Sequence, residues 1–155
     1  MQSGCLRLAL VLLLAGCARM PQYVAPAAGN TATVIFANQM PHKAFVRHYA
    51  VPQDCREPSD LPDIETRGEF QIPVAAGGEW AFAFGAGDEK ENCVVVGSFR
   101  PEMGASYRAT LRSSAGGCIL SMVRLSDNTR VAFQPKVLSS PYNSTNNSAC
   151  LPAQT

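Results

Sequence analysis

The spacing of the apolar residues constrains the fold most strongly, because they alternate with polar or small residues in short segments between turns. Segment 80–84 shows the pattern clearly: Trp80, Phe82 and Phe84 alternate with alanines and would share one face of an extended strand. Beyond residue 30 no segment has the 3.6-residue apolar period of a convincing amphipathic helix. The 12 glycines and 11 prolines indicate many turns. The sequence therefore predicts an all-β protein.

About eight short strands are expected, separated by turn signals at intervals that suit a sandwich. The expected strands are 31–37, 44–50, 69–74, 80–84, 93–99, 106–112, 117–126 and 129–134. Asp127-Asn128 is a hairpin signal between the last two strands, and 51–68 reads as a long loop. We predict a small antiparallel β-sandwich stapled by disulfides, with a small closed β-barrel as the alternative.

The segment Phe99–Tyr107 (FRPEMGASY) places a proline and a glycine just before the expected strand 106–112, which contains Tyr107. It resembles the tyrosine corner of Ig-like and fibronectin-type domains. In such a corner the tyrosine hydroxyl bonds to the preceding backbone. This resemblance covers nine residues and bears on the fold alone.

The N-terminal segment has the pattern of a secretory signal. Arg7 precedes an apolar run, Leu8 to Cys17, that is too short to span a membrane. The sequence Leu14-Ala15-Gly16-Cys17 at the end of this run resembles the lipobox of bacterial lipoproteins. The resemblance covers about the first 20 residues, and it implies cleavage before Cys17 and acylation of that cysteine. In the lipoproteins that the segment resembles, a second mature residue other than Asp, here Ala18, implies sorting to the outer membrane, with the domain expected on the periplasmic side.

These patterns divide the chain into four expected parts. They are a lipoprotein signal peptide (1–16), a lipidated cysteine with a flexible tether (17–30), a β-sandwich domain (31–137) and a polar C-terminal tail pinned by Cys150 (138–155). At roughly 3.5 Å per residue, residues 18–30 could reach about 45 Å from the bilayer.

Four cysteines remain after cleavage and lipidation: Cys55, Cys93, Cys118 and Cys150. An even number in an exported protein predicts two disulfides. Three pairings are possible, and we prefer Cys55–Cys93 with Cys118–Cys150. The wide spacing contains no pair of the C-x₂-C type, so we expect no metal site and no cofactor.

The charge balance excludes strongly basic functions. The chain has 13 basic and 12 acidic residues, and removal of Arg7 with the signal would leave the two signs equal. A nucleic-acid-binding domain usually carries a basic excess, so nucleic acid is not an expected partner. The expected partners are the membrane, through the lipid anchor, and an envelope protein.

The sequence contains few of the residues and motifs that a catalytic mechanism requires. Its two histidines are His42, expected in a turn, and His48, expected in a strand. No G-x-S-x-G, H-E-x-x-H or S-x-x-K motif is present. Two loops, 51–68 and 85–92, contain several carboxylates, which we interpret as solvated. We therefore expect no enzymatic activity and no catalytic residue.

The best candidate for a binding surface is the stripe Phe45, Arg47 and Tyr49, which alternate along one expected strand. Tyrosine and arginine are enriched at interaction hot spots. The leading hypothesis is a non-catalytic outer-membrane lipoprotein that contributes to envelope structure or docks a partner. The alternatives are an inhibitor with a protruding loop, a glycan or small-ligand binder that uses Trp80, Phe82 and Phe84, and, less favoured, a secreted hydrolase.

Overall fold

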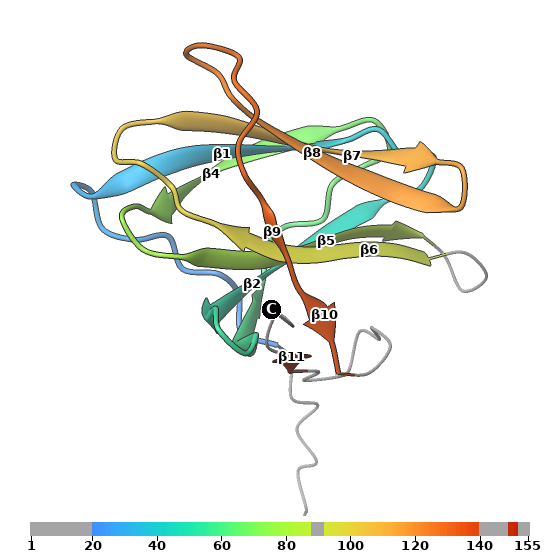
Figure 1. Cartoon of the computed structure of the whole chain (residues 1–155), viewed down its shortest axis with the longest axis horizontal. Helices are drawn as coiled ribbons and strands as arrows, with labels where there is room; N and C mark the ends of the chain where they lie inside the picture. The colour runs from blue at the N-terminus through green and yellow to red at the C-terminus, as the bar shows by residue number, and fades with distance from the viewer. Residues whose placement is uncertain (1–19, 88–91, 140–148, 152–155) are drawn as a thin grey trace, which may run out of the picture.

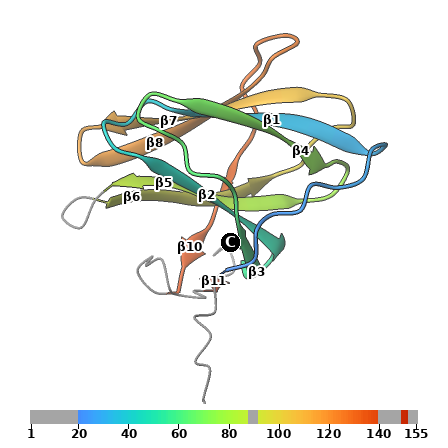
Figure 2. The same cartoon turned by 180° about the vertical axis from the view of Figure 1, so that it is seen from behind.

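Two stacked β-sheets form the body of the protein in the computed structural model, which describes residues 20–87, 92–139 and 149–151 (Figures 1 and 2). The four-stranded sheet has the order β4-β1-β7-β8, the five-stranded sheet the order β3-β2-β5-β6-β9, and β10 pairs with β11. The strands are β1 (Thr31–Asn38), β2 (Ala44–Val51), β3 (Arg56–Asp60), β4 (Glu69–Ala75), β5 (Trp80–Gly87), β6 (Asn92–Phe99), β7 (Ser106–Ser114), β8 (Gly117–Arg124), β9 (Gln134–Pro135), β10 (Val137–Leu138) and β11 (Cys150–Leu151). The described residues contain no helix. The predicted β-sandwich is confirmed, and the sheets are open rather than closed into a barrel.

The strand pairs are antiparallel with one exception, because β1 runs parallel to β7. A parallel pair needs a long connection, and here five strands separate its members along the chain. Alternation along a strand does not reveal the direction of its neighbour, so the sequence could not predict this pair.

Aromatic side chains fill the space between the sheets. Trp80, Phe82 and Phe84 of β5 all point inward and are at most 3% exposed, as their alternation predicts. Phe36 of β1 meets the rings of Phe82 and Phe84 edge-on, with centroids 5.3 Å apart in each pair. Edge-to-face contacts of this kind stabilise cores beyond simple area burial. The three aromatics therefore belong to the core, which leaves little support for a glycan site built on them.

The predicted tyrosine-corner bond is present. Tyr107, at the start of β7, is buried, and its hydroxyl accepts a hydrogen bond of 2.9 Å from the backbone N–H of Glu102. The bond ties the segment before β7 to the strand itself.

Strand β3 lies inside the segment 51–68 that we predicted to be a loop. Its sequence, REPSD, is polar and contains Pro58, both of which argue against a strand. β3 is the edge strand beside β2, where a proline is tolerated and polar side chains stay in water. The ion pair between Arg47 of β2 and Asp60 of β3, at 2.7 Å, joins the two strands.

The predicted hairpin after β8 is only partly correct. The turn is present, because Asn128 has a φ of 56° and the Asp127 carboxylate accepts a hydrogen bond from the Thr129 N–H. The chain then makes only a short return along β8, through a bridge between Val123 and Arg130. It next crosses to the other sheet, where β9 pairs with β6.

Two disulfides are present as predicted, but our preferred pairing is wrong. Cys93 is bonded to Cys118, and Cys55 to Cys150. Cys93 and Cys118 are the second residues of β6 and β8, so their bridge connects the two sheets at one end of the sandwich. Cys55 lies between β2 and β3, where the backbone N–H of Cys150 donates to the Asp54 carbonyl. Sequence separation alone could not show that these ends meet.

The C-terminal segment covers the outer face of the five-stranded sheet. A second apolar cluster joins Tyr49, Ala81, Ala83 and Val96 of that face to Cys55, Cys150 and, less buried, Leu138. Figure 1 shows β10 and β11 beneath this sheet, on the side away from the four-stranded sheet. The Cys55–Cys150 bridge thus holds the end of the chain against the sandwich.

Candidate functional site

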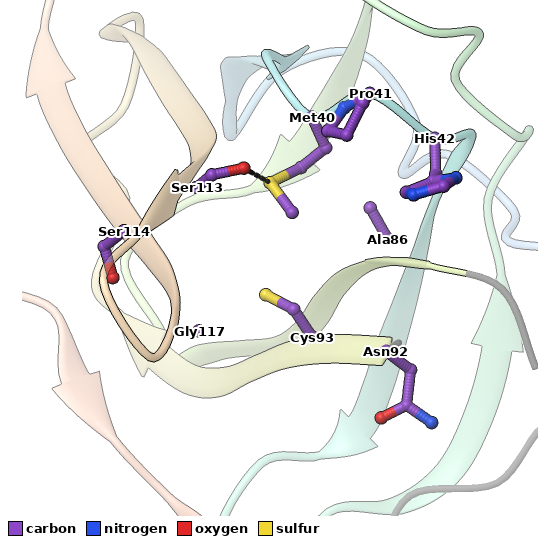
Figure 3. A pocket seen from close by; sticks show the side chains of 9 residues that line it. All are labelled: Met40, Pro41, His42, Ala86, Asn92, Cys93, Ser113, Ser114 and Gly117. Carbon is purple, nitrogen blue, oxygen red and sulfur yellow. Dashed lines mark hydrogen bonds between the residues drawn. The ribbon is translucent and has the colours of Figure 1, made fainter. Parts of the chain in front are cut away.

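A cavity of about 500 Å³ opens at the end of the sandwich that carries the Cys93–Cys118 bridge (Figure 3). Its walls come from five places in the chain: the β1–β2 turn, the end of β5, the start of β6, the end of β7 and the start of β8. Concave sites of this size, with apolar walls and a few polar groups, are the usual sites for small ligands. It is the candidate functional site.

Asn38 shapes the turn that forms one wall. Its buried side chain accepts a hydrogen bond from the Met40 N–H at 2.9 Å and donates to the His42 carbonyl at 2.8 Å. It also donates to the carbonyl of Glu65 at 3.1 Å. These three bonds fix the turn through a fully satisfied amide, which places Met40 and His42 at the cavity.

The remaining wall is neutral and rich in sulfur. The Met40 thioether accepts a hydrogen bond of 3.4 Å from the Ser113 hydroxyl, and Figure 3 shows it directed into the cavity opposite Cys93. Ser114 and Asn92 contribute polar groups, and His42 is the one titratable side chain among the described lining residues. Such a wall suits an uncharged ligand with apolar and hydrogen-bonding parts.

A smaller cavity of about 360 Å³ lies beside β6 and β9, and it is charged. Glu79 accepts a 2.6 Å hydrogen bond from the Ser98 hydroxyl and lies 3.0 Å from the Lys136 ammonium. The Ser98 bond, followed by the hydrogen bond and charge of Lys136, lowers the pKa of Glu79 despite its partial burial. Because Ser98 is fully buried, we interpret the contacts among Glu79, Ser98 and Lys136 as a structural network rather than a nucleophilic site.

The stripe proposed as a binding surface faces outward from the five-stranded sheet, but it is covered. Arg47 and Tyr49 are each 4% exposed. Phe45 is half-buried and lies over Gly85, where an added Cβ would come within 2.6 Å of the Phe45 ring. Tyr49 packs with Cys150 and Leu138 of the C-terminal segment, so a partner could reach it only after that segment had moved.

His48, which was expected in a strand, lies in β2 and points into the sandwich. Its ring stacks on Trp80 at a centroid distance of 5.1 Å and meets Tyr23 edge-on at 5.1 Å. Burial lowers the pKa of His48 to about 4. Sequence reasoning missed the part played by Tyr23, which lies in the segment expected to be a tether.

The carboxylates of segment 51–68 do not converge on either cavity. Asp54 pairs with Arg56, Asp60 with Arg47, and Glu65 with Lys43. Asp88, Glu89 and Glu91 of the second acidic loop, like Cys17, lie outside the described residues.

In the part of the chain that the structure describes, no group of three or more His, Cys, Asp or Glu side chains could hold a metal ion. The same residues form no helix of the length and apolarity needed to cross a bilayer.

Comparison with models of known protein families gave no match, and a search of curated proteins found no sequence similar to this one.

Proposed function

We propose that the protein is a lipoprotein of the bacterial outer membrane that docks an envelope partner on the periplasmic side without catalysing a reaction. The observation that carries the proposal is the sequence Leu14-Ala15-Gly16-Cys17 at the end of a short apolar run. Two disulfides support export to an oxidising compartment. Two or three acyl chains on one cysteine give a stable anchor, since a single chain binds only marginally.

Metabolic labelling tests the anchor. Cells that express the protein are grown with radioactive palmitate, and the envelope fraction is compared with that of a Cys17→Ser variant. We expect label in the wild-type protein and none in Cys17→Ser, which should also remain as an uncleaved precursor. Equal labelling of the two proteins would refute the anchor.

The outer face of the four-stranded sheet is the surface that best supports docking. The opposite face is covered by the C-terminal segment, whereas Ile35 of β1 and Arg108 of β7, which are paired in register, are partly exposed. Thr33 and Thr110 share this face, and Arg112 at its end is exposed. Arginine is enriched at protein–protein interfaces, and this face presents Arg108 and Arg112 beside the apolar side chain of Ile35.

Site-specific photo-cross-linking in intact envelopes tests the docking surface. A photoreactive residue at Ile35 should capture an envelope protein, while the same residue at Met103, which lies in an exposed loop, serves as the matched control. Capture at Met103 but not at Ile35 would place the partner elsewhere. Capture at neither position would count against a docking role.

A second candidate function is the binding of a small uncharged ligand, and the cavity beside Met40 and Cys93 favours it. The uncharged fluorescent probe N-phenyl-1-naphthylamine should gain fluorescence with the wild-type protein. A Ser114→Trp variant, which fills the cavity from its rim, should abolish the gain. Equal fluorescence with the two proteins would show that the probe binds outside the cavity.

A further inference from the structure

The segment before β1 is built into the sandwich. Pro21 and Tyr23 bracket Asp60 of β3: the Asp60 N–H donates to the Pro21 carbonyl, and the Tyr23 N–H donates to the Asp60 carbonyl, both at 2.9 Å. Gln22 forms a parallel bridge with the same residue. The chain therefore adds itself to the outer edge of the five-stranded sheet, which β3 would otherwise leave unpaired.

The side chain of Tyr23 closes the seam between the two sheets. Its hydroxyl donates to the Pro73 carbonyl of β4, in the four-stranded sheet, at 3.1 Å. Its ring packs edge-on against His48 and Trp80 of the five-stranded sheet. A single residue thus contacts both layers at the edge where β3 and β4 lie.

Because this segment is docked on β3, the stretch of chain between a lipid anchor at Cys17 and the domain is shorter than the expected tether. The expected tether 18–30 would allow about 45 Å of reach. If Cys17 is the lipidated residue, only four peptide steps separate it from Pro21, which is at most about 14 Å. A domain held at that distance cannot rotate freely above a bilayer.

The place where the described chain begins then indicates which side faces the membrane. In Figures 1 and 2 the described chain begins beside β3 and β11, below the five-stranded sheet, and the four-stranded sheet lies on the far side. The side nearest the anchor is therefore the one covered by the C-terminal segment.

We infer that residues 21–23 act as a strap that fixes the orientation of the sandwich on the membrane. The covered side of the five-stranded sheet, where β10 and β11 lie, faces the bilayer, and the outer face of the four-stranded sheet points into the periplasm. This inference rests on the proposed lipid anchor at Cys17. The kind of partner that the β3 side meets is a lipid surface.

The only tryptophan in the chain, Trp80, is a built-in probe of the strap. It is buried and contacts Tyr23. In the purified protein, Tyr23→Ala should shift Trp80 emission to longer wavelength and increase its quenching by acrylamide. Val24→Ala is the matched control, because Val24 is 84% exposed in the same segment and should leave both signals unchanged. Unchanged quenching in Tyr23→Ala would overturn the strap.

Orientation is measured by energy transfer from Trp80 to a dansyl group on phospholipid headgroups. The chain from Cys17 onward is coupled through the Cys17 thiol to a maleimide phospholipid in phosphatidylcholine vesicles. This attachment is independent of acylation in the cell, which palmitate labelling tests separately. The energy-transfer assay can therefore refute the fixed orientation while palmitate labelling still supports the lipid anchor, and the reverse outcome is also possible.

Two variants change the expected transfer in this assay. Insertion of ten Gly and Ser residues between Arg19 and Met20 leaves the strap docked but lengthens the spacer, and transfer from Trp80 should fall. Tyr23→Ala should lower it as well, while Val24→Ala should match the wild type. If Tyr23→Ala fails to fold, the spacer variant decides alone. Equal transfer in the wild type and the spacer variant would overturn the fixed orientation.

Discussion

His48 shows how a single position can take a role that its residue type does not suggest. Histidine often serves as a general base in enzymes, yet here the imidazole lies between Trp80, on which it stacks, and Tyr23, which it meets edge-on. The Ser59 hydroxyl, 3.3 Å from Nδ1, is its hydrogen-bonding neighbour. The His48 side chain is half-buried, and its Nδ1 atom faces Ser59 of the edge strand β3.

The burial of His48 predicts a loss of stability in mild acid. Its pKa is about 4 in the folded protein and about 6.5 in the unfolded chain. The unfolded state therefore binds the proton first, and stability falls as pH drops from about 6.5 to about 4. Each unit of pKa difference between the folded and unfolded states corresponds to about 1.4 kcal/mol in the free energy of unfolding. Urea unfolding of the wild type and His48→Gln at pH 7 and pH 5 checks this: the variant should lose less stability between the two values.

Gly97 is a second residue whose identity is set by its surroundings. An added Cβ would lie 2.4 Å from the Gln134 carbonyl oxygen and 2.4 Å from the Phe133 ring. The backbone of β9 cannot easily retreat, because it is paired with β6. Gly97→Ala should therefore destabilise the protein by roughly 1–3 kcal/mol, as overpacked core positions do. Thermal unfolding measures the loss, and an unchanged midpoint would contradict the close packing of β9.

At the scale of elements, strands with clear alternation were predicted well, while two segments were not. β3 is polar and contains Pro58, and it becomes a strand because Arg47 and the β2 backbone pair with it. Segment 129–134 has the alternation of a strand. Instead of continuing its hairpin, it carries Phe133 across to the core beside Phe82, at a centroid distance of 5.5 Å. Tertiary contacts override local propensity in both places.

The two disulfides should differ in their response to reductant. Cys55 and Cys150 are at most 4% exposed, whereas Cys93 and Cys118 are half-buried beside the open cavity. Mild dithiothreitol under native conditions should therefore reduce Cys93–Cys118 first. Alkylation followed by peptide mass spectrometry identifies the reduced pair. Release of Cys55–Cys150 first would mean that the C-terminal cover opens readily.

The sandwich as a whole has one covered and one uncovered outer face. Arg47 lies on the covered face and its side chain is 5% exposed, whereas Arg108 on the other face is 35% exposed. The arginine reagent phenylglyoxal should therefore modify Arg108 and Arg112 well before Arg47. Peptide mass spectrometry over a time course measures the order. Equal rates for Arg47 and Arg112 would show that the cover is not closed in solution.

The candidate site could be predicted only in part. His42 and the four paired cysteines attracted attention as residue types, but the cavity depends on the Asn38 side chain, which fixes the β1–β2 turn. Asn38 reads in sequence as an ordinary turn residue. The stripe Phe45, Arg47 and Tyr49 was correctly predicted to share one face, yet Tyr49 is buried against a segment about a hundred residues further along the chain.

The sequence by itself determined the all-β class, most strand positions, the inward side of β5 and the presence of two disulfides. These properties depend on alternation between neighbouring residues or on an even count of cysteines, and both are local information. Only the tertiary structure decided the parallel β1–β7 pair, the disulfide connectivity, the covered face and the docking of Tyr23. Each of these depends on which distant segments meet, and that is set by the packing of the two sheets.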